Sequence, residues 1–213
     1  MFALLTLIKN EIHDYLAYFF GALIFSVILI GIAISIICNY KPVETPYLSI
    51  GSGILVIIIT ILGFCVMGAI QMYTDRTRNI SAFLLTLPVR RNQILTARIV
   101  TGLLAILTFF VSANIAVIFL SRLFIQPIPI YNRMIFEITE TIFLMAIACY
   151  CLGLQTGWSS NKVTPILGGL ILTFVLITLI AVKGFGFHSN IILILLIIAS
   201  LVRIRHKFMP TTL

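Results

Sequence analysis

The sequence predicts an all-α integral membrane protein with six transmembrane helices in a single domain over residues 1–213. The chain is 61% hydrophobic and only 9% charged, and its mean hydropathy is +1.20. Soluble domains are about half apolar and about a quarter charged, so this balance favours the bilayer. Apolar runs of about 20 residues, the length of a spanning helix, follow one another with short polar interruptions. Six such spans account for the whole length.

An amphipathic pattern occupies residues 1–16. Leu5, Ile8 and Ile12 recur at helical spacing, while Lys9 and its polar neighbours fall on the opposite side. A helix of this kind lies in the membrane interface, so we expect an interfacial helix before the first span. The alternative is that these residues simply begin the first span.

Polar or proline-containing turns divide the remainder of the chain. The expected spans are residues 17–38, 48–71, 99–121, 133–156, 163–182 and 190–202. The last span is short for a hydrocarbon core of about 30 Å. Either it begins within the Gly-Phe linker of residues 184–187, or the bilayer thins around it.

Basic residues are distributed unequally between the two sides of this topology. Ten of the 14 fall on one side: Lys9, Arg76, Arg78, Arg90, Arg91, Arg98, Lys162, Arg203, Arg205 and Lys207. The positive-inside rule therefore places both termini in the cytoplasm, with the protein in a plasma membrane or bacterial inner membrane. This bias and attraction to anionic lipid also explain the net charge of +8, so no nucleic-acid partner is expected.

Motifs for bond-making chemistry are missing from the sequence. It contains no GxxxxGK[ST], HExxH or GxSxG, and no Cys/His set with metal-ligand spacing. Cys149 and Cys151 are two residues apart and would point to different sides of a helix. We therefore expect no enzyme activity, metal or cofactor in this chain. An integral-membrane enzyme is the weaker alternative, because Glu137, Glu140 and a stray histidine do not make a catalytic constellation.

The segment between spans two and three, residues 72–98, carries five of the 14 Lys and Arg residues. Within it an apolar stripe recurs at i, i+3, i+4 and i+7, formed by Ile80, Phe83, Leu84 and Leu87. Pro88 would end this helix, because the residue before a proline is pushed out of the α region. The pattern predicts a short amphipathic helix across the cytoplasmic face, held between two spans.

Residues 75–91 resemble the loop after the second span in ABC-2 type ABC transporter permeases. In that family an acidic-basic run leads to a Leu-Leu-Ser-Leu-Pro-(Val/Ile)-Ser-Arg-like segment, followed by another basic residue before the third span. Here the sequence LLTLPV at residues 84–89 and Arg91 match this pattern, and Arg98 takes the later basic position. The rest of the chain is similar to the family in its layout of helices.

Three positions depart from the family pattern. Asn79 stands where many members have glycine, and Arg90 replaces the usual small residue. Asp75 is a single acidic residue where two or more are common. The resemblance therefore does not indicate which salt bridges form in this loop.

The resemblance implies a permease subunit of an ABC exporter, with ATP bound and hydrolysed by a separate ATPase subunit. A second permease copy, identical or paralogous, would complete the pathway, and the substrate would be hydrophobic or amphipathic: a peptide antibiotic, a drug-like molecule or a lipid. The loop would dock the ATPase or contact lipid phosphates through Asp75, Arg76, Phe83, Leu84, Leu87, Pro88, Arg90 and Arg91. The alternative is a non-transporting scaffold, sensor or immunity protein that binds a partner through the same basic loop.

Three polar residues inside the spans are candidates for a substrate site or gate. Glu137 and Glu140 share one face of span four, and Asn114 lies near the middle of span three. The alternative for the glutamates is an interfacial pair of Arg133 with Glu137, with Glu140 facing water. For Asn114 the alternative is a hydrogen bond between helices.

Overall fold

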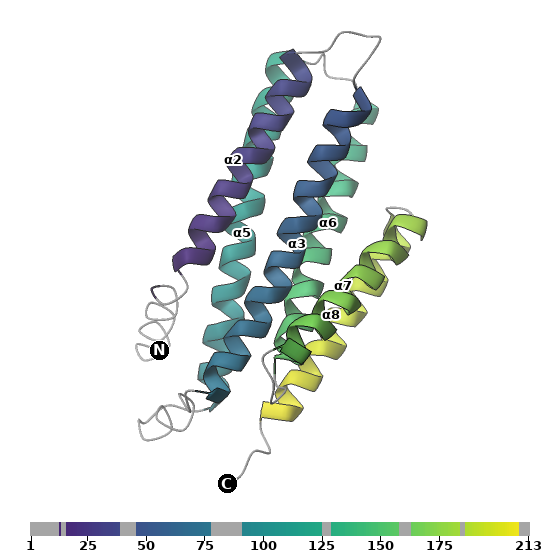
Figure 1. Cartoon of the computed structure of the whole chain (residues 1–213). Helices are drawn as coiled ribbons and strands as arrows, with labels where there is room; N and C mark the ends of the chain where they lie inside the picture. The colour runs from purple at the N-terminus through teal and green to yellow at the C-terminus, as the bar shows by residue number, and fades with distance from the viewer. Residues whose placement is uncertain are drawn as a thin grey trace.

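The computed structural model describes residues 13, 16–38, 46–77, 91–124, 129–157, 163–183 and 186–208. This part of the chain folds into six helices (Figure 1). They are α2 (Leu16–Cys38), α3 (Pro46–Thr77), α5 (Arg91–Phe124), α6 (Pro129–Thr156), α7 (Val163–Lys183) and α8 (Phe187–Phe208). The expected all-α architecture is confirmed. The interfacial helix expected in residues 1–16 lies almost entirely outside the described residues.

Four of the helices contain segments that are long and apolar enough to cross a membrane. These segments are Ile54–Thr74, Gln93–Ile115, Phe136–Thr156 and Phe187–His206. Two shorter apolar segments, Phe19–Ile32 and Leu167–Ile180, belong to α2 and α7. The length and composition of the four longer segments indicate a multi-pass membrane protein.

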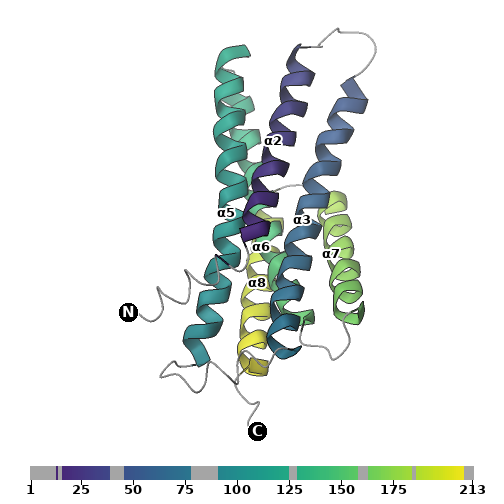
Figure 2. The same ribbon diagram turned by 60° about the vertical axis from the view of Figure 1, so that its left-hand side comes forward.

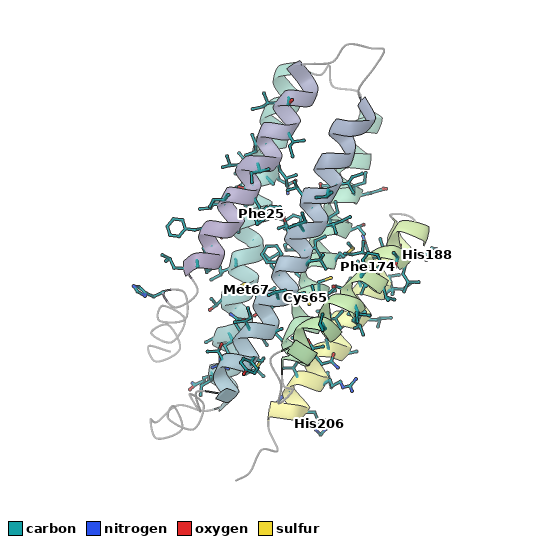
Figure 3. All side chains as sticks on the ribbon, in the orientation of Figure 1. Phe25, Cys65, Met67, Phe174, His188 and His206 are labelled. Atoms are coloured by element: carbon teal, nitrogen blue, oxygen red, sulfur yellow. The ribbon has the colours of Figure 1, made fainter. Side chains whose placement is uncertain are left out.

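Helix α6 lies at the centre of the arrangement and packs against α3, α5, α7 and α8. Helix α2 packs on the other side of the bundle, against α5 and α3. Both views show α2 displaced along the bundle relative to α7 and α8 (Figures 1 and 2). Helix α2 therefore lies beside one part of the long central helices, and α7 and α8 lie beside another. The labelled His188 and His206 mark the two ends of α8 (Figure 3).

Several helices continue beyond the spans expected from the sequence. Pro46 begins α3 and Pro129 begins α6. A proline is tolerated in the first turn of a helix because its missing N–H would have no intrahelical partner there. Helix α8 starts at Phe187, inside the Gly-Phe linker, and continues through the basic tail to Phe208. The expected last span of residues 190–202 is thus extended at both ends.

Helices α3 and α5 also enter the segment 72–98 that the sequence suggested as a loop. Helix α3 continues to Thr77 and α5 begins at Arg91. Their buried faces extend with them, because Met72 on α3 and Ile94 on α5 are almost fully buried. Burial of an apolar face stabilises a helix that propensity alone would leave marginal. Residues 78–90 join these two helix ends, and we call this end of the bundle the loop end.

A close backbone contact joins α3 and α6 through glycines. A Cβ atom added at Gly153 would overlap the main-chain oxygen of Cys65, and one at Gly157 would lie 2.5 Å from the main-chain oxygen of Ala69. Gly157 directly follows the end of α6 and its N–H donates to the main-chain oxygen of Gly153 at 3.0 Å, so the two glycines lie on one face of the helix end. Small residues at this spacing let two backbones approach closely, as in membrane helix dimers.

A chain of four phenylalanines connects α3, α5 and α6 further along the bundle. The ring centroids of Phe64 and Phe109 are 6.0 Å apart, those of Phe109 and Phe110 are 5.2 Å apart, and those of Phe110 and Phe143 are 5.2 Å apart. All three pairs are edge-to-face, with interplanar angles of 69°, 88° and 79°. Such pairs add to the stabilisation that burial of the rings provides.

Hydroxyl groups along the described helices, buried and exposed, bond to the main chain of their own helices. Thr101 Oγ1 donates to the main-chain oxygen of Ala97 at 2.8 Å, and Thr173 Oγ1 donates to that of Leu170 at 2.8 Å. The same pattern recurs at Ser26, Thr60, Thr108, Ser112, Thr156 and Thr178. A polar group in an apolar setting is costly unless it finds such a partner, and these bonds within a helix supply one for each hydroxyl.

Replacing Gly153 with alanine is expected to destabilise the protein, because the new methyl group would force α3 and α6 apart. Overpacking of this kind costs about 1–3 kcal/mol. The Tm of the detergent-solubilised protein should fall by several degrees, as followed by light scattering or size-exclusion chromatography after heating.

The matched control is Gly63→Ala on α3, where nothing lies within 4 Å of the added Cβ. This variant should melt as the natural protein does. Equal losses in both variants would contradict the assignment of close α3–α6 packing to Gly153.

Candidate functional site

A buried polar network joins three helices close to the loop end. Tyr150 on α6 is completely buried, and its hydroxyl donates to Gln71 Oε1 on α3 at 2.7 Å. The main-chain oxygen of Arg98 on α5 lies 3.0 Å from the same hydroxyl. A phenol has one proton to donate, so this proton is shared between acceptors on two different helices.

Two glycines make room for the tyrosine. A Cβ atom at Gly102 on α5 would overlap the Tyr150 ring, and one at Gly68 on α3 would lie 2.6 Å from the Tyr150 main-chain oxygen. Gly102 is four residues after Arg98, and Gly68 is three residues before Gln71, so each glycine shares a helical face with a member of the network. The ring therefore fits into a recess formed by both neighbouring helices.

The other side chains of the network are also shielded from solvent. Gln71 is 1% exposed and Arg98 is 3% exposed. Gln71 Nε2 has no hydrogen-bond partner among the described residues. An ionisable residue at membrane depth is costly and usually functional. Three helices thus bring buried polar groups of Tyr150, Gln71 and Arg98 together, which makes this network the candidate functional site.

Three of the eight predicted docking residues lie at the loop end, next to this network. Asp75 and Arg76 belong to the last turns of α3, and Arg91 is the first residue of α5. The other predicted docking residues lie outside the described residues: Phe83, Leu84, Leu87, Pro88 and Arg90. Gln71 is four residues before Asp75, and Arg98 is seven residues after Arg91, so the network begins one to two helical turns inside the bundle.

The candidate gate residues lie in a different part of the bundle. Glu137 and Glu140 are exposed on α6, two to four helical turns before Tyr150. Asn114 Nδ2 donates to the main-chain oxygen of Phe110 at 2.8 Å, within its own helix. These three residues are thus separate from the network around Tyr150.

Asn114 contributes to an open groove between α5 and α6. The groove has a volume of about 350 Å³ and is lined by Phe110, Val111, Asn114, Ile115, Thr139 and Phe143. Its lining is mainly apolar. The edge-to-face pair of Phe110 and Phe143 lies at this groove, between it and the Tyr150 network.

Two further polar contacts attach α8 to α6. Thr141 Oγ1 donates to Asn190 Oδ1 at 2.8 Å, and Thr141 is completely buried. Toward the loop end, Gln155 Oε1 accepts from Arg203 Nε at 3.0 Å and from Nη1 at 3.1 Å, once the amide is oriented with its oxygen toward the guanidinium. Bonds near both ends of the α6–α8 contact fix the register of these helices.

Metal chemistry finds no support in the described part of the chain. No group of three or more His, Cys, Asp or Glu side chains there could hold a metal ion. Cys65, Cys149 and Cys151 are free thiols buried in the core, where cysteine acts as a small packing residue.

Sequence reasoning did not identify Tyr150, and it assigned Arg98 to a loop. One available signal was the presence of single polar residues in otherwise apolar runs: Gln71 after Ile70, and Tyr150 between Cys149 and Cys151. A periodicity argument does not reveal which of these residues meet, because Tyr150 is 79 residues from Gln71 and 52 from Arg98 along the chain.

Comparison with known proteins gives no match: no family model, no curated protein and no solved structure aligns significantly with this chain.

Replacing Tyr150 with phenylalanine is expected to lower the free energy of unfolding. The ring would remain in its recess, but two buried oxygens would lose their shared donor. Loss of a buried hydrogen bond costs about 1–2 kcal/mol, including in membrane proteins. Thermal or denaturant unfolding in detergent would measure the change.

Thr178→Val supplies a control, because the Thr178 hydroxyl is exposed and bonds within α7 to the oxygens of Phe174 and Val175. The Gln71→Leu variant should show less than additive loss when it is combined with Tyr150→Phe. Unchanged stability of Tyr150→Phe would show that the network contributes nothing to the fold.

Proposed function

We propose that this chain is the membrane-spanning permease subunit of an ABC exporter, of the ABC-2 type. In this proposal α2, α3, α5, α6, α7 and α8 are six spans, and both termini and the loop end face the cytoplasm. A separate ATPase subunit binds and hydrolyses ATP, and a second copy of the permease, identical or paralogous, completes the pathway. The substrate is hydrophobic or amphipathic.

The observation that carries this proposal is the position of the Leu-Pro-basic motif in the helix order. Residues 84–89, which match the permease pattern, lie between α3 and α5, and the matching Arg91 is the first residue of α5. A partner that displaces this segment acts on both helix ends at once. An ATPase that works by closing and opening beneath the membrane needs such an element to transmit its motion.

The Tyr150 network supports a coupling role for this segment. Tyr150 belongs to α6, and its hydroxyl contacts α3 through Gln71 and α5 through the main-chain oxygen of Arg98. A displacement of the loop would therefore pass to three helices together rather than bend one of them. Close packing favours this behaviour, because packed interfaces move between discrete arrangements and resist gradual deformation.

The proposal predicts that an ATPase with a P-loop and an ABC signature co-purifies with the tagged protein after gentle detergent extraction from its native host. Leu87→Asp combined with Arg91→Glu should lower the recovery of this ATPase at least about tenfold, since one apolar and one charged docking contact are lost. Mass spectrometry of the purified material would quantify the recovery.

Arg205→Glu serves as the charge-reversing control, because Arg205 is exposed on α8 and does not belong to the segment between α3 and α5. It should retain the ATPase. If no ATPase is recovered with the natural protein under several gentle extractions, the permease proposal is wrong. The scaffold, sensor or immunity function would then take its place, and the other co-purifying proteins would identify its partner.

A further inference from the structure

The groove between α5 and α6 has the size of a small-molecule site. Its volume of about 350 Å³ lies near the lower end of the range of about 300–1,000 Å³ that is typical of ligand pockets. A single alkyl chain or a small ring system would fill such a space. A folded peptide or a large glycan would not fit within it.

One face of α6 borders this groove. Phe136, Thr139, Glu140 and Phe143 recur at i, i+3, i+4 and i+7, which places them on neighbouring positions of a helix surface. Thr139 and Phe143 line the groove. Glu140 directly follows Thr139 and precedes Phe143 by about one turn, so its position on α6 neighbours those of two lining residues. Glu140 and Phe136 are both exposed.

The polar atoms at this position are mostly hydrogen-bond acceptors. Glu140 has two carboxylate oxygens and no proton to donate when it is ionised. The Asn114 amide donates one of its two N–H groups to Phe110, and its carbonyl oxygen can accept a hydrogen bond from a ligand. Thr139 adds a hydroxyl, which can also accept. A cationic donor such as an ammonium group complements this set, whereas an anion would be repelled.

The apolar lining selects the other part of the ligand. Phe110, Val111, Ile115 and Phe143 form most of the groove wall, and Val111 and Ile115 are 51% and 64% exposed. An alkyl chain bound along this wall would cover apolar surface, while an attached amine would reach the carboxylate at the edge. A neutral lipid tail would cover the apolar wall but offer no positive charge to the Glu140 carboxylate.

We propose that this groove binds cationic amphiphiles, with the alkyl chain between α5 and α6 and the amine at Glu140. This inference rests on the proposed transport function and narrows its substrate class from amphipathic molecules in general to those that carry a positive charge. Glu140 is then a specificity-determining residue, and Phe110 with Phe143 forms the closed end of the site.

The test uses the full-length protein, without any partner, in nanodiscs of zwitterionic phosphatidylcholine. The probe is a dansyl-labelled dodecylammonium, and a sulfonate with the same fluorophore and chain is compared with it. Binding of the ammonium probe should saturate and should be about tenfold tighter than binding of the sulfonate. Glu140→Gln should weaken the ammonium probe about fivefold and leave the sulfonate unweakened, as expected for a partly exposed charge pair.

A second variant tests the groove itself. Val111→Trp places a large side chain in the groove and should abolish saturable binding of both probes, whereas Leu172→Trp at an exposed position of α7 should not. Equal affinity for the two probes would overturn the cationic specificity and identify a general acyl-chain site. If Glu137→Gln weakens binding of the ammonium probe as much as Glu140→Gln does, the preference for cations comes from the overall negative charge of this surface. Glu140 would then have no specific role.

This experiment is independent of the ATPase assay. If the probes bind with the expected specificity but no ATPase co-purifies, the groove remains a site for cationic amphiphiles and the permease function is contradicted. An ATPase that co-purifies with a protein whose groove shows no saturable probe binding would support the permease function and overturn the groove assignment alone.

Discussion

The close approach of α3 and α6 is the contact from which the other arrangements follow. Gly153 and Gly157 bring the backbone of α6 directly onto the main chain of α3 near Cys65 and Ala69. Inside a bilayer there is little hydrophobic force between helices, so van der Waals contact at short range must supply much of the association energy. With α6 held at this distance, the Tyr150 side chain, three residues before Gly153, is within hydrogen-bonding distance of Gln71 on α3.

The same contact determines how polar groups are distributed along the bundle. Near the loop end, α3, α5 and α6 lie close enough for a tyrosine hydroxyl, an amide and a main-chain oxygen to meet in a space closed to solvent. Farther away, α5 and α6 meet through the Phe110 and Phe143 rings and then leave the groove open. Along α5 and α6, the Tyr150 network, the contact of Phe110 with Phe143 and the apolar groove thus follow one another in this order.

The sequence predicted the helical architecture and the order of the apolar segments because both depend on local composition and periodicity. It missed several helix ends for a definite reason: Pro46 and Pro129 were treated as breaks, although proline fits the first turn of a helix. It identified Glu140 and Asn114 as candidates but not the groove beside them. That groove depends on the separation of two helices, and the packing of Phe110 against Phe143, 33 positions apart, sets this separation without leaving a periodic trace.

The division of one phenolic proton between two helices has a mechanical consequence. A hydroxyl group with a single acceptor either keeps its hydrogen bond or loses it. Tyr150 has an acceptor at 2.7 Å on α3 and another at 3.0 Å on α5, so it can retain either bond while the other lengthens. The junction therefore keeps α6 bonded to α3 or to α5 when the three helices shift, and the bundle need not expose an unbonded hydroxyl to its apolar interior.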